Sequence, residues 1–219
     1  MCSDRPRIAF DLDGTLLDAR ERQVGLAMAI SRRCRWTEFD GRRFWSAKRR
    51  GATTVQALLR MGAALALAER IGNGWQAQIE HPRWLALDRP LPGVPRVLER
   101  VIDSGFAPVL LTARRDSDAL QNQLRTLGLH HLLDQVHVVC PDRITTEKAA
   151  VLRRPSILAY VGDTEADAAA AAAAHVPFAA AASGQRNRSF LRARGIERVF
   201  PAVGGAVDAL LSEVLADVR

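Results

Sequence analysis

Short apolar runs alternate with helical patterns along most of this chain, and that alternation restricts the folds open to it. Five runs have the composition of buried strands: residues 7–12, 107–112, 136–139, 157–162 and 178–181. The helical patterns are Val94, Val97, Leu98, Val101 and Ile102 before Gly105, and Leu120, Leu124 and Leu127 before Gly128. Strands that alternate with helices build a parallel sheet covered on both faces. The sequence therefore predicts a doubly wound, Rossmann-like α/β fold.

Residues 19–90 interrupt this alternation. They contain no convincing strand, but Val55, Leu58 and Leu59 have helical spacing, and all four tryptophans of the chain fall within the segment. We therefore predict two parts: a sheet domain formed by residues 1–18 and 91–219, and an inserted helical domain formed by residues 19–90.

The basic residues are dispersed. The formal net charge is +7, and Lys48 and Lys148 are the only lysines, so almost every basic residue is an arginine. The arginines occur as scattered pairs rather than as a block, which is typical of a solvated surface. We expect no nucleic-acid partner.

The length of the apolar runs and the arrangement of the cysteines indicate where in the cell the protein is located. Every apolar run is interrupted before the roughly 20 residues that a membrane helix needs, and the N-terminal residues do not resemble a signal peptide. Cys2, Cys34 and Cys140 form no CxxC pair, which fits free thiols in a reducing compartment. We expect a cytoplasmic protein without a membrane partner.

Polar residues follow the predicted strands where each strand ends, and this edge of a parallel sheet is where ligands bind. They are Asp11, Asp13, Thr112, Asp163 and Asp167, with Lys148 early in a helix that Thr145 or Thr146 could cap. Four carboxylates at one point repel each other unless a cation neutralises them, and Mg²⁺ prefers oxygen ligands. The pattern indicates metal-assisted chemistry on an anion.

These residues, as Asp11-x-Asp13-Gly-Thr, Thr112, Lys148 and Gly-Asp163-x-x-x-Asp167, resemble the four motifs of the haloacid dehalogenase superfamily in order and spacing. The resemblance implies that residues 19–90 are a C1-type helical cap. It is closest to the phosphoglycolate phosphatase-like and β-phosphoglucomutase-like members. Separate turn and capping residues are the alternative interpretation.

The resemblance also implies a role for each catalytic residue. Asp11 would attack phosphorus and form an aspartyl-phosphate, which divides one difficult displacement into two easier ones. Asp13 would protonate the leaving alkoxide and later deprotonate water. Lys148 would neutralise charge, and Thr112 with the Ala113 amide would hold the phosphoryl oxygens.

The implied metal site holds Mg²⁺ through Asp11, Asp163 and the backbone carbonyl of Asp13, with Asp167 supporting the metal shell. Asp13 also separates subfamilies, because the dehalogenases lack an acid at that position. An acid there suits a phosphate ester, whose leaving group needs a proton, so we predict a phosphatase.

The inserted residues 19–90 indicate the size of the substrate. A cap that closes over the site favours a small, soluble phosphate ester, and Lys48, Arg49 and Gly51 resemble the substrate loop of such caps. A charged helix ending at a C-terminal glycine is the alternative interpretation of these residues.

Two further functions remain open. A phosphomutase is one, although sugar phosphomutases carry a histidine where this chain has Gln23. A non-catalytic binding protein with the same fold is the other. The sequence leaves open which ester is bound, phosphoglycolate-like or sugar-phosphate-like, and whether the protein is a monomer or a homodimer.

Overall fold

The computed structural model describes residues 5–217 and contains a six-stranded sheet in the order β5-β4-β1-β6-β7-β8, with every neighbouring pair parallel. The strands are β1 (Arg7–Phe10), β4 (Ala107–Ala113), β5 (Gln135–Val139), β6 (Ile157–Gly162), β7 (Phe178–Ala181) and β8 (Val199–Phe200). Five of them match the predicted strands, and β8 is a short edge strand that the sequence did not predict. The predicted doubly wound α/β fold is confirmed.

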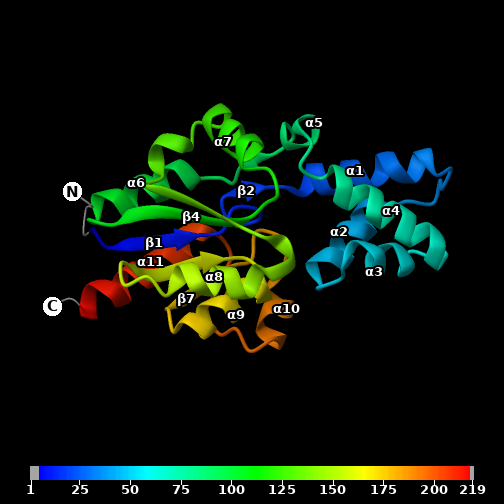
Figure 1. Ribbon diagram of the computed structural model, residues 1–219. Coiled ribbons are helices and arrows are strands. Elements are labelled where there is room, and N and C mark those ends of the chain that lie inside the picture. The colour runs from blue at the N-terminus through cyan, green and yellow to red at the C-terminus, as the bar shows by residue number, and fades with distance from the viewer. Residues whose placement is uncertain (1–4, 218–219) are drawn as a thin grey trace.

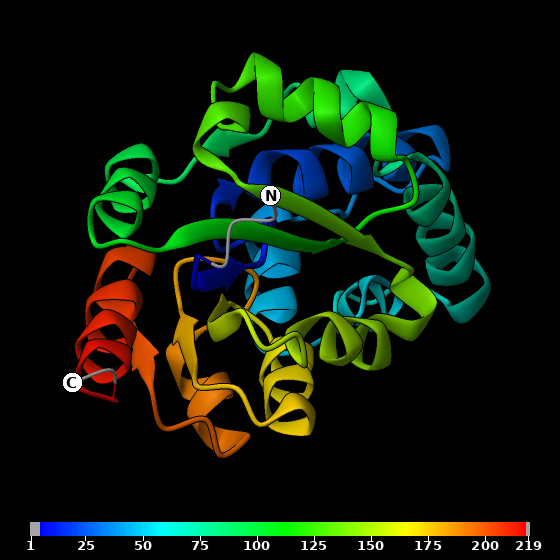
Figure 2. The same cartoon turned by 60° about the vertical axis from the view of Figure 1, so that its left-hand side comes forward.

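Helices cover both faces of this sheet, as Figures 1 and 2 show. One face packs against α6 (Val94–Asp103), α7 (Ser117–Thr126) and α11 (Val203–Asp217). The other face packs against α8 (Ile144–Leu152) and α9 (Glu165–Ala174). The remaining pieces near the sheet are α10 (Arg188–Ala193) and the 3₁₀ turns η1 (His130–Leu132) and η2 (Pro141–Arg143). β1 is central, so the chain crosses from one side of it to the other between β5 and β6.

The predicted helix ends are where the sequence placed them. In α6, Val94, Val97, Leu98 and Val101 are buried against the sheet, and the helix stops just before Gly105, which has a φ of +92°. A positive φ is accessible to glycine at little cost, which is why glycine ends helices. The alanine-rich residues of α9 are helical as well, because alanine is the best helix former.

One predicted cap is wrong. The α8 helix begins at Ile144 and its N-cap residue is Arg143, whose side chain makes no capping hydrogen bond, so neither Thr145 nor Thr146 caps it. The reason is that η2 runs directly into α8, which starts the helix before the two threonines.

Five helices lie together beside the sheet domain, on the right of Figure 1. They are α1 (Arg20–Arg33), α2 (Gly41–Arg49), α3 (Thr54–Leu59), α4 (Leu65–Gln78) and α5 (Pro82–Leu85). They share an apolar core of their own around Phe44, Leu58 and Ile71. We call this group the cap, and its limits at residues 19 and 90 stay a prediction.

The two chain segments that join the cap to the sheet domain run side by side. Strand β2 (Leu17–Asp18) pairs antiparallel with β3 (Arg89–Pro90). The expectation that residues 19–90 contain no strand is therefore wrong at its last two residues, because the exit segment finds the entry segment as its partner. We call this pair the hinge, because both connections between cap and sheet domain run through it.

Within residues 5–217, no helix combines the length and the apolar character that a membrane span requires. Cys34 and Cys140 are free thiols, and Cys2 lies outside the described residues.

Candidate active site

The predicted site residues meet at the carboxyl ends of three adjacent strands. Asp11 directly follows β1, Thr112 lies near the end of β4, and Asp163 directly follows β6. Because β1 pairs with both β4 and β6, these strand ends are neighbours at one edge of the sheet. Lys148 reaches the same place from α8 and Asp167 from α9.

Lys148 joins two of the carboxylates. Its Nζ lies 2.6 Å from Asp11 Oδ1 and 2.6 Å from Asp167 Oδ1, and the residue is 1% exposed. Tyr160, the only tyrosine of the chain, donates to the same Asp167 oxygen at 2.6 Å and accepts from Lys148 at 2.9 Å. Thr164 Oγ1 donates to the other oxygen, Asp167 Oδ2, at 2.6 Å. Asp167 is therefore fully engaged with the protein.

The three buried carboxyl groups titrate differently. Burial raises the pKa of Asp11 to about 7, because desolvation and the nearby Asp167 charge outweigh the opposing effect of Lys148. Burial also raises the pKa of Asp163, with the charges of Asp11 and Asp167 acting in the same direction. Burial alone would raise the pKa of Asp167, but the charge and hydrogen bond of Lys148 hold it below its usual value.

Asp11, Asp163 and Asp167 each offer an oxygen within 4.8 Å of the others, which is a geometry that a metal ion can use. Asp163 Oδ1 is buried and has no hydrogen-bond partner, whereas Asp167 has its oxygens engaged. An unpartnered carboxylate oxygen beside a second carboxylate suits a hard divalent cation such as Mg²⁺. The donor set therefore fits the predicted metal, with Asp11 and Asp163 as direct ligands and Asp167 as support.

Two glycines allow the loops around Asp163 to approach closely. A Cβ on Gly14, whose φ is +99°, would lie 2.0 Å from Asp163 Oδ2. A Cβ on Gly184 would lie 2.2 Å from the same oxygen. The neighbouring Gln185 backbone N–H donates to Asp163 Oδ2, and its side chain donates to the Asp13 carbonyl at 3.1 Å.

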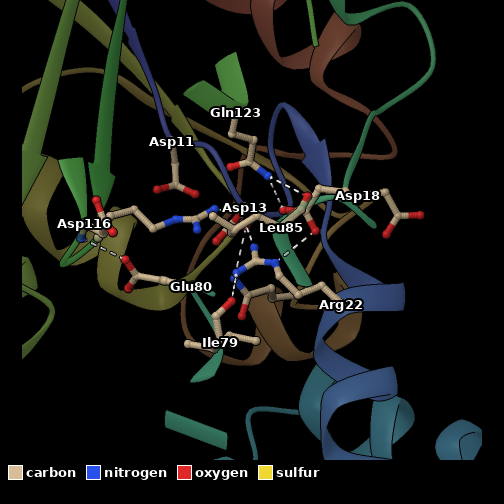
Figure 3. Close-up of polar contacts among 12 residues, drawn as sticks. Asp11, Asp13, Asp18, Arg22, Ile79, Glu80, Leu85, Asp116 and Gln123 are labelled. Atoms are coloured by element: carbon tan, nitrogen blue, oxygen red, sulfur yellow. Dashed lines mark hydrogen bonds and ion pairs between the residues drawn. The ribbon is translucent and has the colours of Figure 1, made fainter. Parts of the chain in front are cut away.

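Asp13 has two partners that the sequence did not predict. Its Oδ1 accepts from Arg22 Nη2 at 2.7 Å, as Figure 3 shows, and from Arg114 Nη2 at 2.8 Å. Burial alone would raise the pKa of Asp13, but the charges of Arg114 and Arg22 hold it below its usual value. The carboxyl group is therefore ionised in this arrangement.

The sequence positions of Arg22 and Arg114 give a weak indication that both side chains face the site. Arg22 is spaced four and eight residues from Leu26 and Ile30, so it lies in the apolar stripe of α1, where a charge needs a buried partner. Arg114 follows Thr112 by two residues, the period of a strand.

The residues of the predicted substrate loop lie at the junction of cap and sheet domain, but Lys48 and Arg49 belong to the last turn of α2 and only Gly51 follows it, as in the alternative interpretation. Arg49 Nη2 donates to the Ala182 and Arg186 carbonyls, and the Asn187 N–H donates to the Arg49 carbonyl at 2.9 Å. Gly51 follows the end of α2 with a φ of +84°, and a Cβ there would lie 2.2 Å from the Phe190 ring. Arg49 and Gly51 thus dock the cap onto the loop after β7 and onto α10.

Unlike Arg49 and Gly51, Lys48 makes its side-chain contacts within the cap. It is 8% exposed, its Nζ donates to Thr54 Oγ1 at 3.3 Å, and it lies 4.9 Å from the centre of the Trp75 ring. Burial, together with the nearby Arg186 charge, lowers the pKa of Lys48 to about 8. Among the described residues no carboxylate forms an ion pair with it, so its charge has no direct counter-ion.

Thr112 is buried at the end of β4 and Ala113 is the last residue of that strand, which leaves both beside Asp11 at the sheet edge. Gln23 is buried in α1, and its carbonyl accepts from the Trp75 indole N–H at 3.0 Å.

Comparison with known proteins gives one family and many similar folds. A family model described as haloacid dehalogenase-like hydrolase matches residues 7–175. No curated protein shows a significant sequence match.

Three solved structures illustrate the similarity. A predicted phosphatase from Clostridium acetobutylicum superposes with a TM-score of 0.70 at 17% identity, covering 98% of this chain and 100% of the other. A predicted phosphoglycolate phosphatase from Haemophilus somnus gives 0.67 at 14%, with 100% of both chains covered. Protein tyrosine kinase A from Mycobacterium tuberculosis gives 0.68 at 20%, covering 95% and 99%. At these identities the likeness establishes the fold and leaves the reaction to the site itself.

Proposed function

The chain belongs to the haloacid dehalogenase-like hydrolases, and from that premise we propose that it is a Mg²⁺-dependent phosphatase acting on the phosphate monoester of a small metabolite. The observation that carries the proposal is the surroundings of Asp11. Lys148 binds this carboxylate at 2.6 Å, the unpartnered oxygen of Asp163 lies in the same cluster, and Asp13 follows two residues later. A nucleophile, a fixed cation, a metal ligand and an acid–base group are thus present together.

The first step forms a bond between an Asp11 oxygen and phosphorus while the bond from phosphorus to the ester oxygen breaks. The leaving alkoxide takes a proton from Asp13. Lys148 offsets the negative charge that gathers around Asp11, and it acts strongly because it is almost fully buried. The product of this step is an aspartyl-phosphate and a free alcohol.

In the second step Asp13 accepts a proton from water as the water oxygen attacks phosphorus and the bond to Asp11 breaks. The ionised Asp13, held by Arg22 and Arg114, is the form that this step requires. The first step needs the protonated form, and a dianionic phosphate ester bound beside Asp13 favours the uptake of that proton.

Asp11, Asp163 and the Asp13 carbonyl would hold the metal, and Asp167 would support it from its contacts with Lys148 and Tyr160. Mg²⁺ in that position would neutralise charge on the phosphoryl oxygens.

Thr112 and the backbone amide of Ala113, at the end of β4, would bind the phosphoryl oxygens of the substrate. Lys48 supplies a second cation from the cap for an anionic part of the substrate, and Arg49 and Gly51 dock the end of α2 that carries it. A seated cap also excludes water that would otherwise compete for the reacting groups. A small, soluble ester fits this arrangement better than a polymer does.

A phosphate-release screen over small phosphate esters tests the proposal, run with Mg²⁺ and with EDTA. We expect release that needs Mg²⁺ and is lost in Asp11→Asn, while Arg20→Lys, an exposed change on α1, leaves it intact. Activity that survives EDTA, or an active Asp11→Asn variant, would overturn the mechanism. Transfer of phosphate between sugar hydroxyls without release would indicate a mutase, and binding without turnover would indicate a non-catalytic relative.

A further inference from the structure

Arg22 links three parts of the molecule through one buried side chain. It is 2% exposed and lies in the first turn of α1, just inside the cap. Its Nη2 donates to Asp13 Oδ1 at 2.7 Å and its Nη1 donates to the Ile79 carbonyl at 3.2 Å (Figure 3). Its Nε donates to Asp88 Oδ1 at 2.9 Å. The guanidinium therefore joins the catalytic turn to the two ends of the cap.

Asp88, beside the exit segment β3, holds Arg22 in place. It is 0% exposed, and its second oxygen, Oδ2, accepts from Gln123 Nε2 at 2.8 Å. The same Nε2 donates to the Leu85 carbonyl at 3.1 Å. Both partners of this nitrogen are acceptors, which fixes the orientation of the Gln123 amide. A continuous chain of contacts thus runs from α7 of the sheet domain through the hinge to Asp13.

The two arginines use only one oxygen of Asp13. Arg22 and Arg114 both donate to Oδ1, and among the described residues none donates to Oδ2. A bidentate guanidinium would occupy both oxygens of the carboxylate, so this arrangement is selective. It leaves Oδ2 as the oxygen that can carry a proton to a substrate.

We propose that Arg22 and Asp88 are positioning residues for the acid–base step: they hold Asp13 so that Oδ2 faces the leaving oxygen, and they do so only while the cap is seated on its hinge. The inference rests on the proposed phosphatase function. Arg114 approaches Asp13 from the sheet domain and stays with it, whereas Arg22 belongs to the cap. Separation of the cap from the sheet domain would therefore remove the Arg22 contact and leave the Arg114 contact to Asp13.

A purely structural ion pair would behave differently, and the leaving group separates the two cases. 4-Nitrophenyl phosphate releases a stable anion that departs without a proton, whereas benzyl phosphate, which is similar in size, releases an alkoxide that needs one. The value of kcat/KM reports the steps up to departure of the alcohol, so it measures the contribution of Asp13 as an acid. General structural damage lowers kcat/KM for both esters alike.

The test compares Arg22→Lys and Asp88→Asn with the control Arg20→Lys on the same helix. We expect kcat/KM for benzyl phosphate to fall by about 10- to 100-fold in both variants, a partial loss of the roughly 100- to 10,000-fold that general acid catalysis contributes, and that for 4-nitrophenyl phosphate by at most about threefold. Adding Arg22→Lys to an Asp13→Asn chain should cause no further loss with benzyl phosphate, since the acid is already absent.

Gln123→Met, two contacts away from Asp13, should give the same selective loss in milder form, and it covers the case in which Asp88→Asn folds poorly. Equal losses with both esters, or a further loss in the Asp13→Asn chain, would overturn this inference alone. A wild-type protein that releases phosphate from neither ester and from none of the small esters in the screen would overturn the proposed function and this inference with it.

Discussion

Lys148 Nζ lies 2.6 Å from Asp11 Oδ1, although 137 residues separate the two in the chain. The same ammonium is 2.6 Å from Asp167, so one buried cation serves two carboxylates. Burial lowers the pKa of a lysine, but Asp11 and Asp167 more than compensate and hold the pKa of Lys148 well above its usual value. Lys148 therefore keeps its charge throughout the neutral pH range.

Replacing Lys148 by methionine should therefore lower the free energy of unfolding and also abolish phosphate release. Two buried carboxylates would lose their shared counter-ion, and removing one partner of such a group costs about 3–5 kcal/mol. Urea unfolding at pH 7 measures the change, with Lys48→Met as the matched control. An unchanged unfolding midpoint for Lys148→Met would show that the ion pair does not contribute to stability.

Lys48→Met should act in the opposite direction on stability at pH 7. Lys48 is buried and the nearby Arg186 charge also disfavours its protonation, so its folded-state pKa of about 8 lies below the unfolded value of 10.5. Between these two pH values the unfolded chain binds the extra proton, so wild-type stability rises with pH there. The difference in free energy of unfolding between Lys48→Met and the wild type should therefore decrease between about pH 8 and pH 10.5. Urea unfolding at pH 7 and pH 10 can measure this decrease.

The same titration should appear in catalysis. As the pH rises through about 8, Lys48 loses its charge and the KM of an anionic substrate should increase. Lys48→Arg should flatten this dependence, because an arginine stays protonated throughout. A KM profile with the same rise near pH 8 in both proteins would exclude Lys48 as its origin.

Metal binding should be visible in the thermal stability of the protein without any substrate. A ligand that binds only the folded state stabilises it by mass action, so added Mg²⁺ should raise the unfolding temperature of the wild type. In Asp163→Asn this rise should disappear, because the unpartnered Asp163 Oδ1 is replaced. Asp142→Asn, an exposed carboxylate outside the cluster, is the control and should keep the full response. An identical rise in unfolding temperature in Asp163→Asn would mean that Mg²⁺ binds at a site that does not include Asp163.

Gly184→Ala should damage the site, whereas Gly204→Ala should not. A Cβ on Gly184 would lie 2.2 Å from Asp163 Oδ2 and 2.3 Å from the Gly14 carbonyl oxygen, so the loops around the metal ligands must move apart. On Gly204, in α11, the nearest atom is at 3.6 Å, an ordinary contact, and alanine there should stabilise the fold by about 0.4–1 kcal/mol. Activity assays and thermal unfolding of both variants measure the contrast; an active Gly184→Ala would mean that these loops are loosely packed.

Much of the fold and the core of the site follow from local patterns. The strand at residues 157–162 ends in Gly162-Asp163, and the parallel arrangement of strands alone brings that end next to Asp11 and Thr112. The hydrophobic periods of α6 and the glycine after it likewise predict that helix and its end. The N-cap of α8 was predicted wrongly, because the preceding turn η2 decides where that helix begins.

The sequence by itself determined the sheet, the inserted helices and the carboxylates and lysine of the centre, because each of these depends on residues close together in the chain or on the rule that parallel strands end at one edge. Only the tertiary structure decided what surrounds Asp13. Arg22, nine residues away, and Arg114, 101 residues away, reach it from the cap and from the sheet domain. The Arg22 contact depends on how the cap docks, and the Arg114 contact depends on the pairing of β4 with β1. Local spacing fixes which face a side chain occupies but not which distant charge it meets.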